Sequence, residues 1–309
     1  MQLKVIIFIG TFLSAVSAGI FFPSFAAYIP VTPSLCLMGL LYFSFINTSL
    51  NQLIADFKTT QKSFYKLIIL KLLILPVIVT AFFHMVLPKY ALSALLLSGI
   101  SVASVAPLLL MIVKADLSIA TIALVGSSLL TPLTLPVLVK IYTDFTANNL
   151  TLNISASDMM ISLVIMIVVP FVLAQLTRLW LSRLHHMLQS CSFYLGLIFA
   201  FLVNYMILAD ISEFLLANLS IIPNSFFISL LMAIILLLLT FVMTYGEARD
   251  QRLTIIICCC GINNMLAVIL CTNFFTPLEV VTTVAYIIPF NMLIPVYRFI
   301  GWKLENKNT

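Results

Sequence analysis

The chain has 309 residues, of which 63% are hydrophobic and only 8% are charged, and its formal net charge at pH 7 is +5. Its mean hydropathy is +1.21, whereas a water-soluble domain carries roughly 25% charged residues. This composition excludes a soluble domain and predicts a protein that crosses a membrane several times. The positive charges gather at the ends of apolar segments, so the net charge does not indicate nucleic-acid binding.

Ten apolar windows follow one another along the chain, each about 20 residues long and so able to cross a bilayer as a helix. We therefore predict an all-α polytopic membrane protein. The longest connection, 142–158, separates predicted five-helix repeats at 1–141 and 159–309 and is expected to be an extracytoplasmic linker. Residues 1–19 also fit a cleaved signal peptide, an alternative to a first span. The windows are 3–22, 34–54, 65–87, 91–113, 118–140, 159–180, 189–209, 225–245, 253–273 and 279–299.

The distribution of cations predicts the orientation. Of the 15 lysines and arginines, Lys89 and Lys140 fall on one side of the predicted membrane, and all the others at span ends fall on the side of the two termini. Such a bias places both termini in the cytoplasm, and we expect a bacterial inner membrane. The cation inside a span is Lys71, and intramembrane charges are functional candidates because burying them is costly. Its side chain could instead extend to the interface, since Lys66 lies only five residues earlier.

Membrane enzymes need a carboxylate pair, a metal set or a catalytic dyad within the membrane. Every Asp and Glu of this chain falls at or near a connection or span end, and no H-E-x-x-H motif occurs. The cysteines lack the C-x-x-C spacing of a metal or redox site. We therefore expect no enzyme activity, no metal and no cofactor. A receptor or a passive channel is a remote alternative, because a channel needs polar groups all along a pore.

The fourth and ninth windows contain matching irregularities. Residues 98–107 place Ser104 and Pro107 in mid-span, and residues 258–270 read CCCGINNMLAVIL, with Asn263 and Asn264 after a glycine. With five spans in each half, corresponding spans are antiparallel, as in the inverted repeats of secondary transporters. Interrupted helices at matching positions predict a binding site at the midplane, where irregular backbone must be buried or line a cavity.

The two adjacent asparagines have two interpretations. Their amides can bond to a cargo at the crossing of the broken helices, where half-helix N-termini favour an anion. They can also merely hold neighbouring helices together. Ser104 and Pro107 belong to the same predicted substrate site. Asn47 of the second window is a further candidate that could line the cavity or bond a neighbouring helix.

Several stretches together resemble the bile acid:sodium symporter family across nearly the whole chain. The segments that carry the resemblance are GIFFPSFAAYIP (19–30), GLLYFSFINTSLNQLIADF (39–57), KLLILPVIV (71–79), IVKADLSIATIALVGSSLLTPLTLP (112–136) and CCGINNMLA (259–267), where the family has E-x-G-x-Q-N. The resemblance implies ten helices in two inverted repeats, a panel and a core domain, and helices 4 and 9 that cross at their breaks. It also implies transport of organic anions, usually with sodium.

The chain departs from this family at the sodium ligands. In the family, the first site uses oxygen-bearing side chains of the fourth and fifth helices and the glutamate of the ninth. The matching positions here carry no oxygen-bearing side chain. Na⁺ needs several oxygen ligands, so we expect the first site to be absent. These positions are Ala106, Pro107, Ala120, Leu124 and Cys259.

At the family's second sodium site, a glutamine of the third helix matches Lys71, and the glutamate and glutamine of the ninth helix match Cys259 and Asn263. The resemblance therefore implies that a fixed ammonium stands where Na⁺ would bind. Lys71 and Cys259 are the predicted coupling residues. A lysine in an apolar setting can also release its proton, which would couple transport to protons, or it can contact the anion directly.

We accordingly predict a secondary transporter for a small organic anion or a bile-acid-like amphipathic carboxylate, independent of sodium and working by alternating access. The partners expected are this cargo and the lipid bilayer. A sodium-coupled symporter of the same family and an auxin-efflux-like carrier remain alternatives. The stretch 112–136, which aligns without gaps, favours the bile acid:sodium symporter family over the latter.

Overall fold

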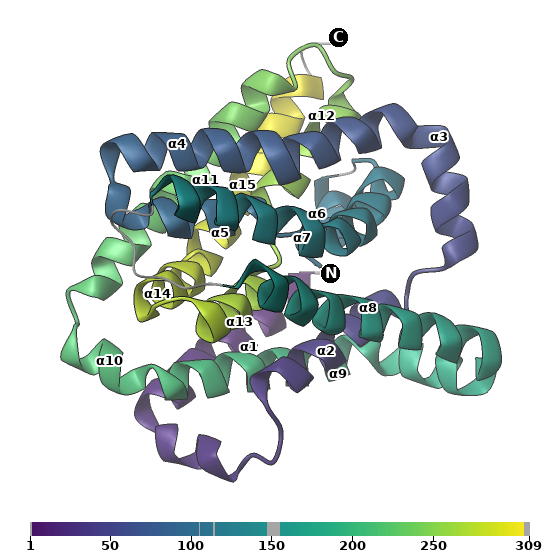
Figure 1. The fold of residues 1–309 in the computed structure, drawn as a ribbon. Coiled ribbons are helices and arrows are strands. Elements are labelled where there is room, and N and C mark those ends of the chain that lie inside the picture. The colour runs from purple at the N-terminus through teal and green to yellow at the C-terminus, as the bar shows by residue number, and fades with distance from the viewer. Residues whose placement is uncertain (1, 105, 114, 147–154, 306–309) are drawn as a thin grey trace. The chain divides into compact units, whose positions relative to one another are not determined.

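The computed structural model describes residues 2–104, 106–113, 115–146 and 155–305, and its regular elements over these ranges are all helices (Figure 1). The chain forms two compact units, one from Met1–Leu50 and Ser162–Ile221, the other from Asn51–Ile161 and Ile222–Thr309. Each unit takes segments from both predicted repeats. The repeats at 1–141 and 159–309 therefore remain a prediction, because the division into packed units does not follow them.

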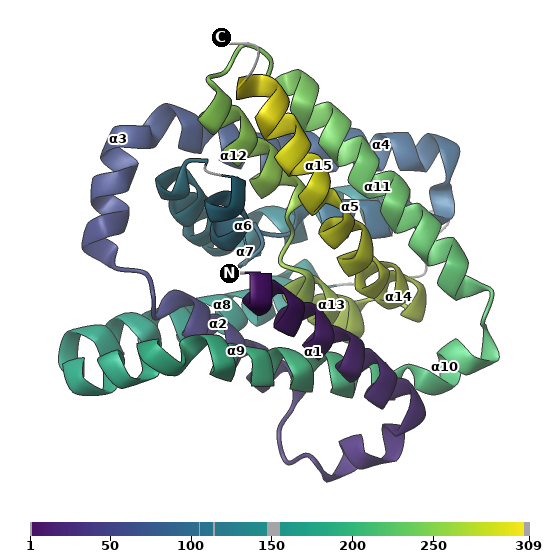
Figure 2. The same cartoon turned by 180° about the vertical axis from the view of Figure 1, so that it is seen from behind.

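The first unit is built around one long helix, α9, against which α1 and α2 pack (Figure 2). Gly19 permits the close approach of α1, since a Cβ at this position would lie 2.8 Å from the Cβ of Leu208. The helices of this unit are α1 (Gln2–Phe21), η1 (Pro23–Tyr28), α2 (Pro33–Phe45), most of α8 (Ala156–Trp180), α9 (Ser182–Asp210) and α10 (Ser212–Ala217).

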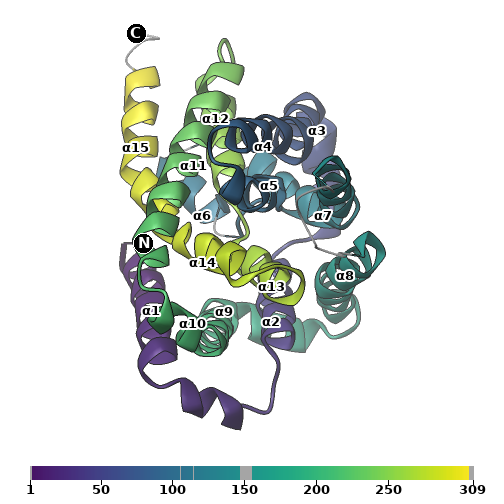
Figure 3. The ribbon, with the colours of Figure 1, turned by 60° about the vertical axis from the view of Figure 1, so that its left-hand side comes forward.

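The second unit contains the interrupted helices. Within it, α4 packs against α5, α13 against α14, and α12 beside α15 (Figure 3). Its helices are α3 (Leu50–Ile69), η2 (Leu70–Ile74), α4 (Leu75–Val86), η3 (Pro88–Tyr90), α5 (Ala91–Gly99), α6 (Ala106–Val113), α7 (Leu117–Phe145), α11 (Ile221–Met243), α12 (Arg249–Cys260), α13 (Asn264–Phe274), α14 (Pro277–Ala285) and α15 (Ile287–Glu305).

Six helical stretches of the described residues are long and apolar enough to cross a membrane. They support a multi-pass membrane protein, and the count of ten spans remains a prediction. The six are Leu50–Val86, Leu117–Phe145, Ala156–Trp180, Ser182–Asp210, Ile221–Met243 and Pro277–Lys303, and the shorter apolar helices are Gly10–Phe21, Pro33–Phe45 and Asn264–Phe274.

Two predicted boundaries need correction. The window 34–54 is not one helix, because α2 ends at Phe45 and α3 begins at Leu50. Asn47, Thr48 and Ser49 lie between them, and such short polar side chains compete for backbone hydrogen bonds. The predicted linker 142–158 is also shorter, since α7 continues to Phe145 and α8 begins at Ala156. Residues 147–154 of that linker lie outside the described residues.

The segment from α3 to α4 is continuous but irregular (Figure 1). It bends at Thr60, whose φ of −122° and ψ of 19° are not helical. The π-helical turn η2 then precedes Pro76, which lacks the N–H that a regular helix requires. Isolated π-turns are frequently found at functional sites, and this one contains Lys71.

Candidate functional site

Two helix interruptions meet within the second unit. The first break, residues 100–104, follows α5, and the second break, residues 261–263, separates α12 from α13. Val102 and Ile262 form an antiparallel bridge. Two backbone hydrogen bonds join the breaks, from Ala103 N to Gly261 O (3.1 Å) and from Asn263 N to Ser101 O (2.9 Å). The interruptions predicted near Pro107 and Gly261 are therefore present, and their extended backbones satisfy one another.

The first break is held mainly by backbone and hydroxyl groups. Val102 N donates to the Oγ of Ser127 on α7 at 3.0 Å. Pro107 is the second residue of α6, where the N–H that it lacks would have no partner in the helix. Proline thus begins the second half-helix here and does not kink a continuous one. Ser104 lies in the turn between the halves and is partly exposed.

Gly261 permits the tight geometry of the second break. A Cβ at this position would lie 2.7 Å from the carbonyl oxygen of Ile257 and 3.5 Å from the Cβ of Ala103. The first contact is shorter than real Cβ atoms show. A side chain would thus force the backbone at position 261 away from the last turn of α12. The glycine is required by the close approach, and its φ of −78° is unstrained.

The two asparagines of the second break have different roles. Asn263 is the N-cap of α13, and its Oδ1 accepts a long hydrogen bond of 3.4 Å from Leu266 N. Its Nδ2, in a residue only 3% exposed, has no hydrogen-bond partner among the described residues. Both amide atoms of Asn264 are buried and likewise lack a partner in the part of the chain that the structure describes. Since buried amides are normally hydrogen-bonded, these groups are available to a bound molecule.

Lys71 lies at the end of α12, directly before the second break. Its side chain is fully buried, at 0% exposure, and its Nζ donates to the carbonyl oxygen of Cys259 at 3.2 Å. The interpretation that this lysine extends to the interface is therefore wrong. The last carbonyls of a helix have no partner within it and carry its negative dipole end. The ammonium thus stabilises the end of α12, where a bound cation would also be favoured.

Tyr286 was not predicted from the sequence but also contacts this helix end. Its hydroxyl donates to the carbonyl oxygen of Cys260 at 2.9 Å, and its side chain is 0% exposed. Ser127 was missed as well. The sequence around both residues is apolar and has no distinguishing pattern, so only the contacts reveal their roles.

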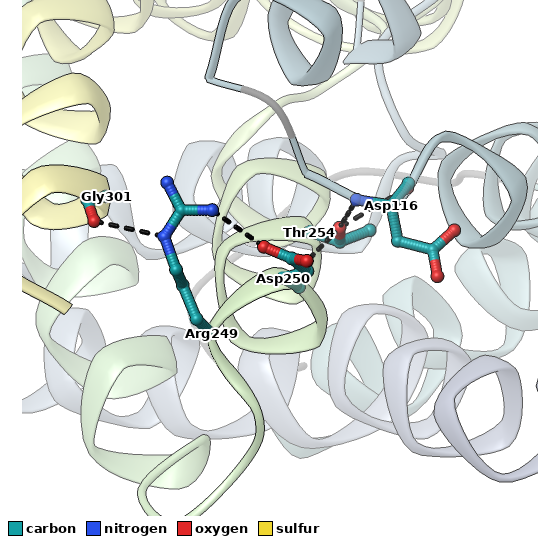
Figure 4. Close-up of polar contacts among 5 residues, drawn as sticks. All are labelled: Asp116, Arg249, Asp250, Thr254 and Gly301. Atoms are coloured by element: carbon teal, nitrogen blue, oxygen red, sulfur yellow. Dashed lines mark hydrogen bonds and ion pairs between the residues drawn. The ribbon is translucent and has the colours of Figure 1, made fainter. Parts of the chain in front are cut away.

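Polar contacts at the start of α12 fix the position of the whole helix (Figure 4). Arg249 donates from Nε to the carbonyl oxygen of Gly301 on α15 at 3.2 Å and pairs with Asp250 at 2.8 Å. The hydroxyl of Thr254 accepts from the N–H of Asp116 at 3.1 Å and donates to the backbone carbonyl of Asp250 at 2.7 Å. These contacts attach α12 to α15 and to the start of α7.

The remaining predicted residues are placed as follows. Cys259 is fully buried, and its carbonyl oxygen, not its thiol, meets Lys71. Asn47 belongs to the first unit, where its Nδ2 donates to Phe43 O and to Ser192 Oγ, each at 3.2 Å. This contact ties the end of α2 to α9. A role of Asn47 in cargo binding therefore stays a prediction.

The arrangement places the N-terminus of α13 and amide N–H donors, which favour negative charge in a bound molecule, beside a buried lysine that bonds to the carbonyl end of α12. In a comparison with known families, the model described as the sodium bile acid symporter family matches residues 34–213, more than half of the chain. No curated protein matches the chain significantly.

Proposed function

The chain belongs to the sodium bile acid symporter family, and from this premise we propose that it carries a small organic anion or a bile-acid-like amphipathic carboxylate without sodium. The family consists of transporters, so this protein is a multi-pass membrane transporter and not, on that ground, an enzyme. The observation that carries the proposal is the pairing of the buried Lys71 ammonium with the carbonyl end of α12 beside two asparagines with unpaired amide groups.

The proposed cargo site is the junction of the two breaks. The N-terminus of α13 presents partial positive charge, and the amides of Asn263 and Asn264 supply hydrogen-bond donors there. Ser104 and Pro107 border the junction from the first break. The breaks themselves carry the buried apolar residues Val102, Ala103 and Ile262, which suits a carboxylate with an apolar body.

The residues at the family's cation positions do not fit sodium. The side chains of Ala106, Ala120 and Leu124 offer no oxygen, and all three are buried. At Cys259 a thiol occupies the position of the family's carboxylate. The backbone carbonyl oxygen of the same residue already accepts a hydrogen bond from Lys71. A hard cation needs several oxygen ligands, whereas the ammonium supplies a positive charge of its own. Sodium therefore has no role in the proposed cycle.

Alternating access and the inverted repeat belong to the same proposal. The antiparallel bridge between Val102 and Ile262 supports corresponding breaks that run in opposite directions, as an inverted repeat requires. We propose two five-helix repeats and ten spans on this pattern. We place both termini in the cytoplasm of a bacterial inner membrane, on the strength of the cation bias. Alternating access would then open a cargo site at the breaks first to one side of the membrane and then to the other.

Uptake into proteoliposomes tests the proposal directly. Radiolabelled cholate and a panel of smaller carboxylates would be offered in sodium buffer and in choline buffer. We expect saturable uptake of at least one carboxylate at the same rate in both buffers. A strict requirement for sodium would reject the role given to Lys71 and favour a sodium-coupled symporter. Uptake of none of the carboxylates would reject the anion carrier.

A further inference from the structure

The last carbonyls of α12 are capped from two directions. The carbonyl of Cys259 accepts from Lys71, and the next one, of Cys260, accepts from the hydroxyl of Tyr286 at 2.9 Å. Tyr286 is among the largest fully buried side chains of the chain. A buried carbonyl left without a donor is costly, so the hydroxyl is needed for the backbone to leave the helix in this direction.

The position of Tyr286 is set by a junction between helices. It stands between α14 and α15, and its backbone N–H bonds to the carbonyls of Thr282 (3.2 Å) and Thr283 (3.3 Å). Farther along α15, the carbonyl of Gly301 accepts from Arg249 at the start of α12 (Figure 4). The segment from Tyr286 to Gly301 is thus bonded to both ends of α12, which leaves the tyrosine little freedom to move.

The Cys260 carbonyl directly precedes the residues that shape the site. Gly261 accepts from Ala103 across the bridge, and Asn263 begins α13. Rotation of the peptide unit after Cys260 would turn Gly261 and shift the amides of the two asparagines that follow. A hydrogen bond that holds the Cys260 carbonyl therefore sets the orientation of the Asn263 and Asn264 amides, although it does not involve them.

We propose that Tyr286 is a positioning residue of the second break. Its hydroxyl holds the Cys260 carbonyl in place, and the carbonyl in turn fixes the Asn263 and Asn264 amides toward the cargo. The effect on cargo rests on the proposed function, whereas the effect on the backbone does not. Removal of the hydroxyl weakens cargo binding and loosens the end of α12.

Native thiols report the backbone effect without any cargo. Cys259 and Cys260 are 0% exposed at the break, and Cys271 is 0% exposed within α13. The full-length protein in proteoliposomes would be treated with N-ethylmaleimide, and the modification of each cysteine would be followed by mass spectrometry. In Tyr286→Phe we expect the modification rate at Cys259 or Cys260 to rise about tenfold, with Cys271 unchanged.

The control is Tyr205→Phe, which removes a buried tyrosine hydroxyl that donates to the carbonyl oxygen of Phe22 at 2.8 Å in the first unit. It should leave the reactivity of Cys259 and Cys260 at the wild-type level. With cholate as the probe, Tyr286→Phe should raise KM about tenfold with little change in kcat, and Tyr205→Phe should not. Equal behaviour of the two variants would overturn the proposal. If wild-type protein transports no carboxylate, the anion carrier fails, but thiol reactivity still decides the role of Tyr286.

A replacement with p-aminophenylalanine at position 286 keeps an N–H donor at the same place on the ring. We expect it to restore low thiol reactivity and the wild-type KM. If Tyr286→Phe does not fold but this variant does, the donor is required, as proposed. If both variants fail to fold, or the amino group restores neither property, the hydrogen bond is not what positions the break, and the proposal falls.

Discussion

The first and second breaks have similar backbones but different side chains. Each lies between two short helices, and the antiparallel bridge gives each break one hydrogen bond as donor and one as acceptor. Around the first break, the hydroxyl of Ser127 accepts a hydrogen bond from the backbone N–H of Val102. Around the second break lie an ammonium, a phenol and two amides. The two breaks therefore have related backbone geometry, whereas the charged, phenolic and amide side chains lie at the second break.

This difference separates what forms the crossing from what binds cargo. The first break is a structural support whose backbone is bonded to the second break and to Ser127. The hydroxyl of Ser101 is buried there without a partner among the described residues, but no amide or charged side chain accompanies it, and we expect changes there to affect stability. The second break has buried amide groups left unpaired, which is costly unless a ligand uses them. Changes there should affect transport more than folding.

The largest effect is expected from removing the charge beside the second break. Lys71→Met should lower carboxylate uptake at least about 100-fold, equivalent to about 2.8 kcal/mol, because the end of α12 loses its positive partner. Stability should fall by no more than about 1–3 kcal/mol, because the Cys259 carbonyl loses its donor, while the removal of a buried charge offsets part of that loss. Initial rates of uptake and thermal unfolding of the same preparation test both statements.

The control for this change is Lys66→Met. Lys66 pairs with Glu247, with the two side chains 34% and 29% exposed, and exposed ion pairs contribute about 0–1 kcal/mol. We expect near-normal transport from this variant. Wild-type uptake by Lys71→Met across the pH range where the protein is stable would remove the lysine from the mechanism.

A methyl group at the closest approach of the second break should destabilise the protein. Gly261→Ala places a Cβ 2.7 Å from Ile257 O, and overpacking of this kind typically costs about 1–3 kcal/mol. Gly196→Ala is the control, because a Cβ there has nothing within 4 Å. Thermal unfolding in detergent should show a lower Tm for Gly261→Ala but not for Gly196→Ala. Equal Tm values for the two variants would contradict the close approach of the backbone at Gly261.

Loss of one unpaired amide should weaken cargo binding without unfolding the protein. Asn264→Ala removes two buried polar atoms that have no partner among the described residues, so stability should hold or improve. KM for cholate should rise about tenfold, or about 1.4 kcal/mol. Asn291→Ala serves for comparison, since that amide already bonds to Ile287 O at 2.7 Å within its own helix. A similar KM in both variants would show that Asn264 does not meet the cargo.

The smallest effect is expected at the first break. Ser127→Ala leaves the N–H of Val102 without its partner, which should cost about 1 kcal/mol of stability. Ser128→Ala removes a buried hydroxyl without a partner and should be neutral. Neither variant should change KM for cholate. An altered KM in Ser127→Ala with unchanged stability would mean that the first break also binds cargo.

Local features of the sequence were sufficient for the class of protein and the location of the breaks. Apolar windows predicted a helical membrane protein, and Gly261 and Pro107 marked the places where a helix cannot run normally. The same reasoning was less successful at span ends. It extended the second window through Asn47 to residue 54, because mean apolarity outweighed the three short polar residues that end α2.

The sequence by itself determined the membrane setting, the helical class, the two interruptions and the presence of one charge within a span, because these depend on composition and on neighbours along the chain. Only the tertiary structure decided that the buried Lys71 donates to the carbonyl of Cys259, 188 positions away along the chain, and that Tyr286 donates to the carbonyl of Cys260. Such contacts depend on which helix faces pack together. The spacing of apolar residues along one helix does not reveal which other helix packs against it.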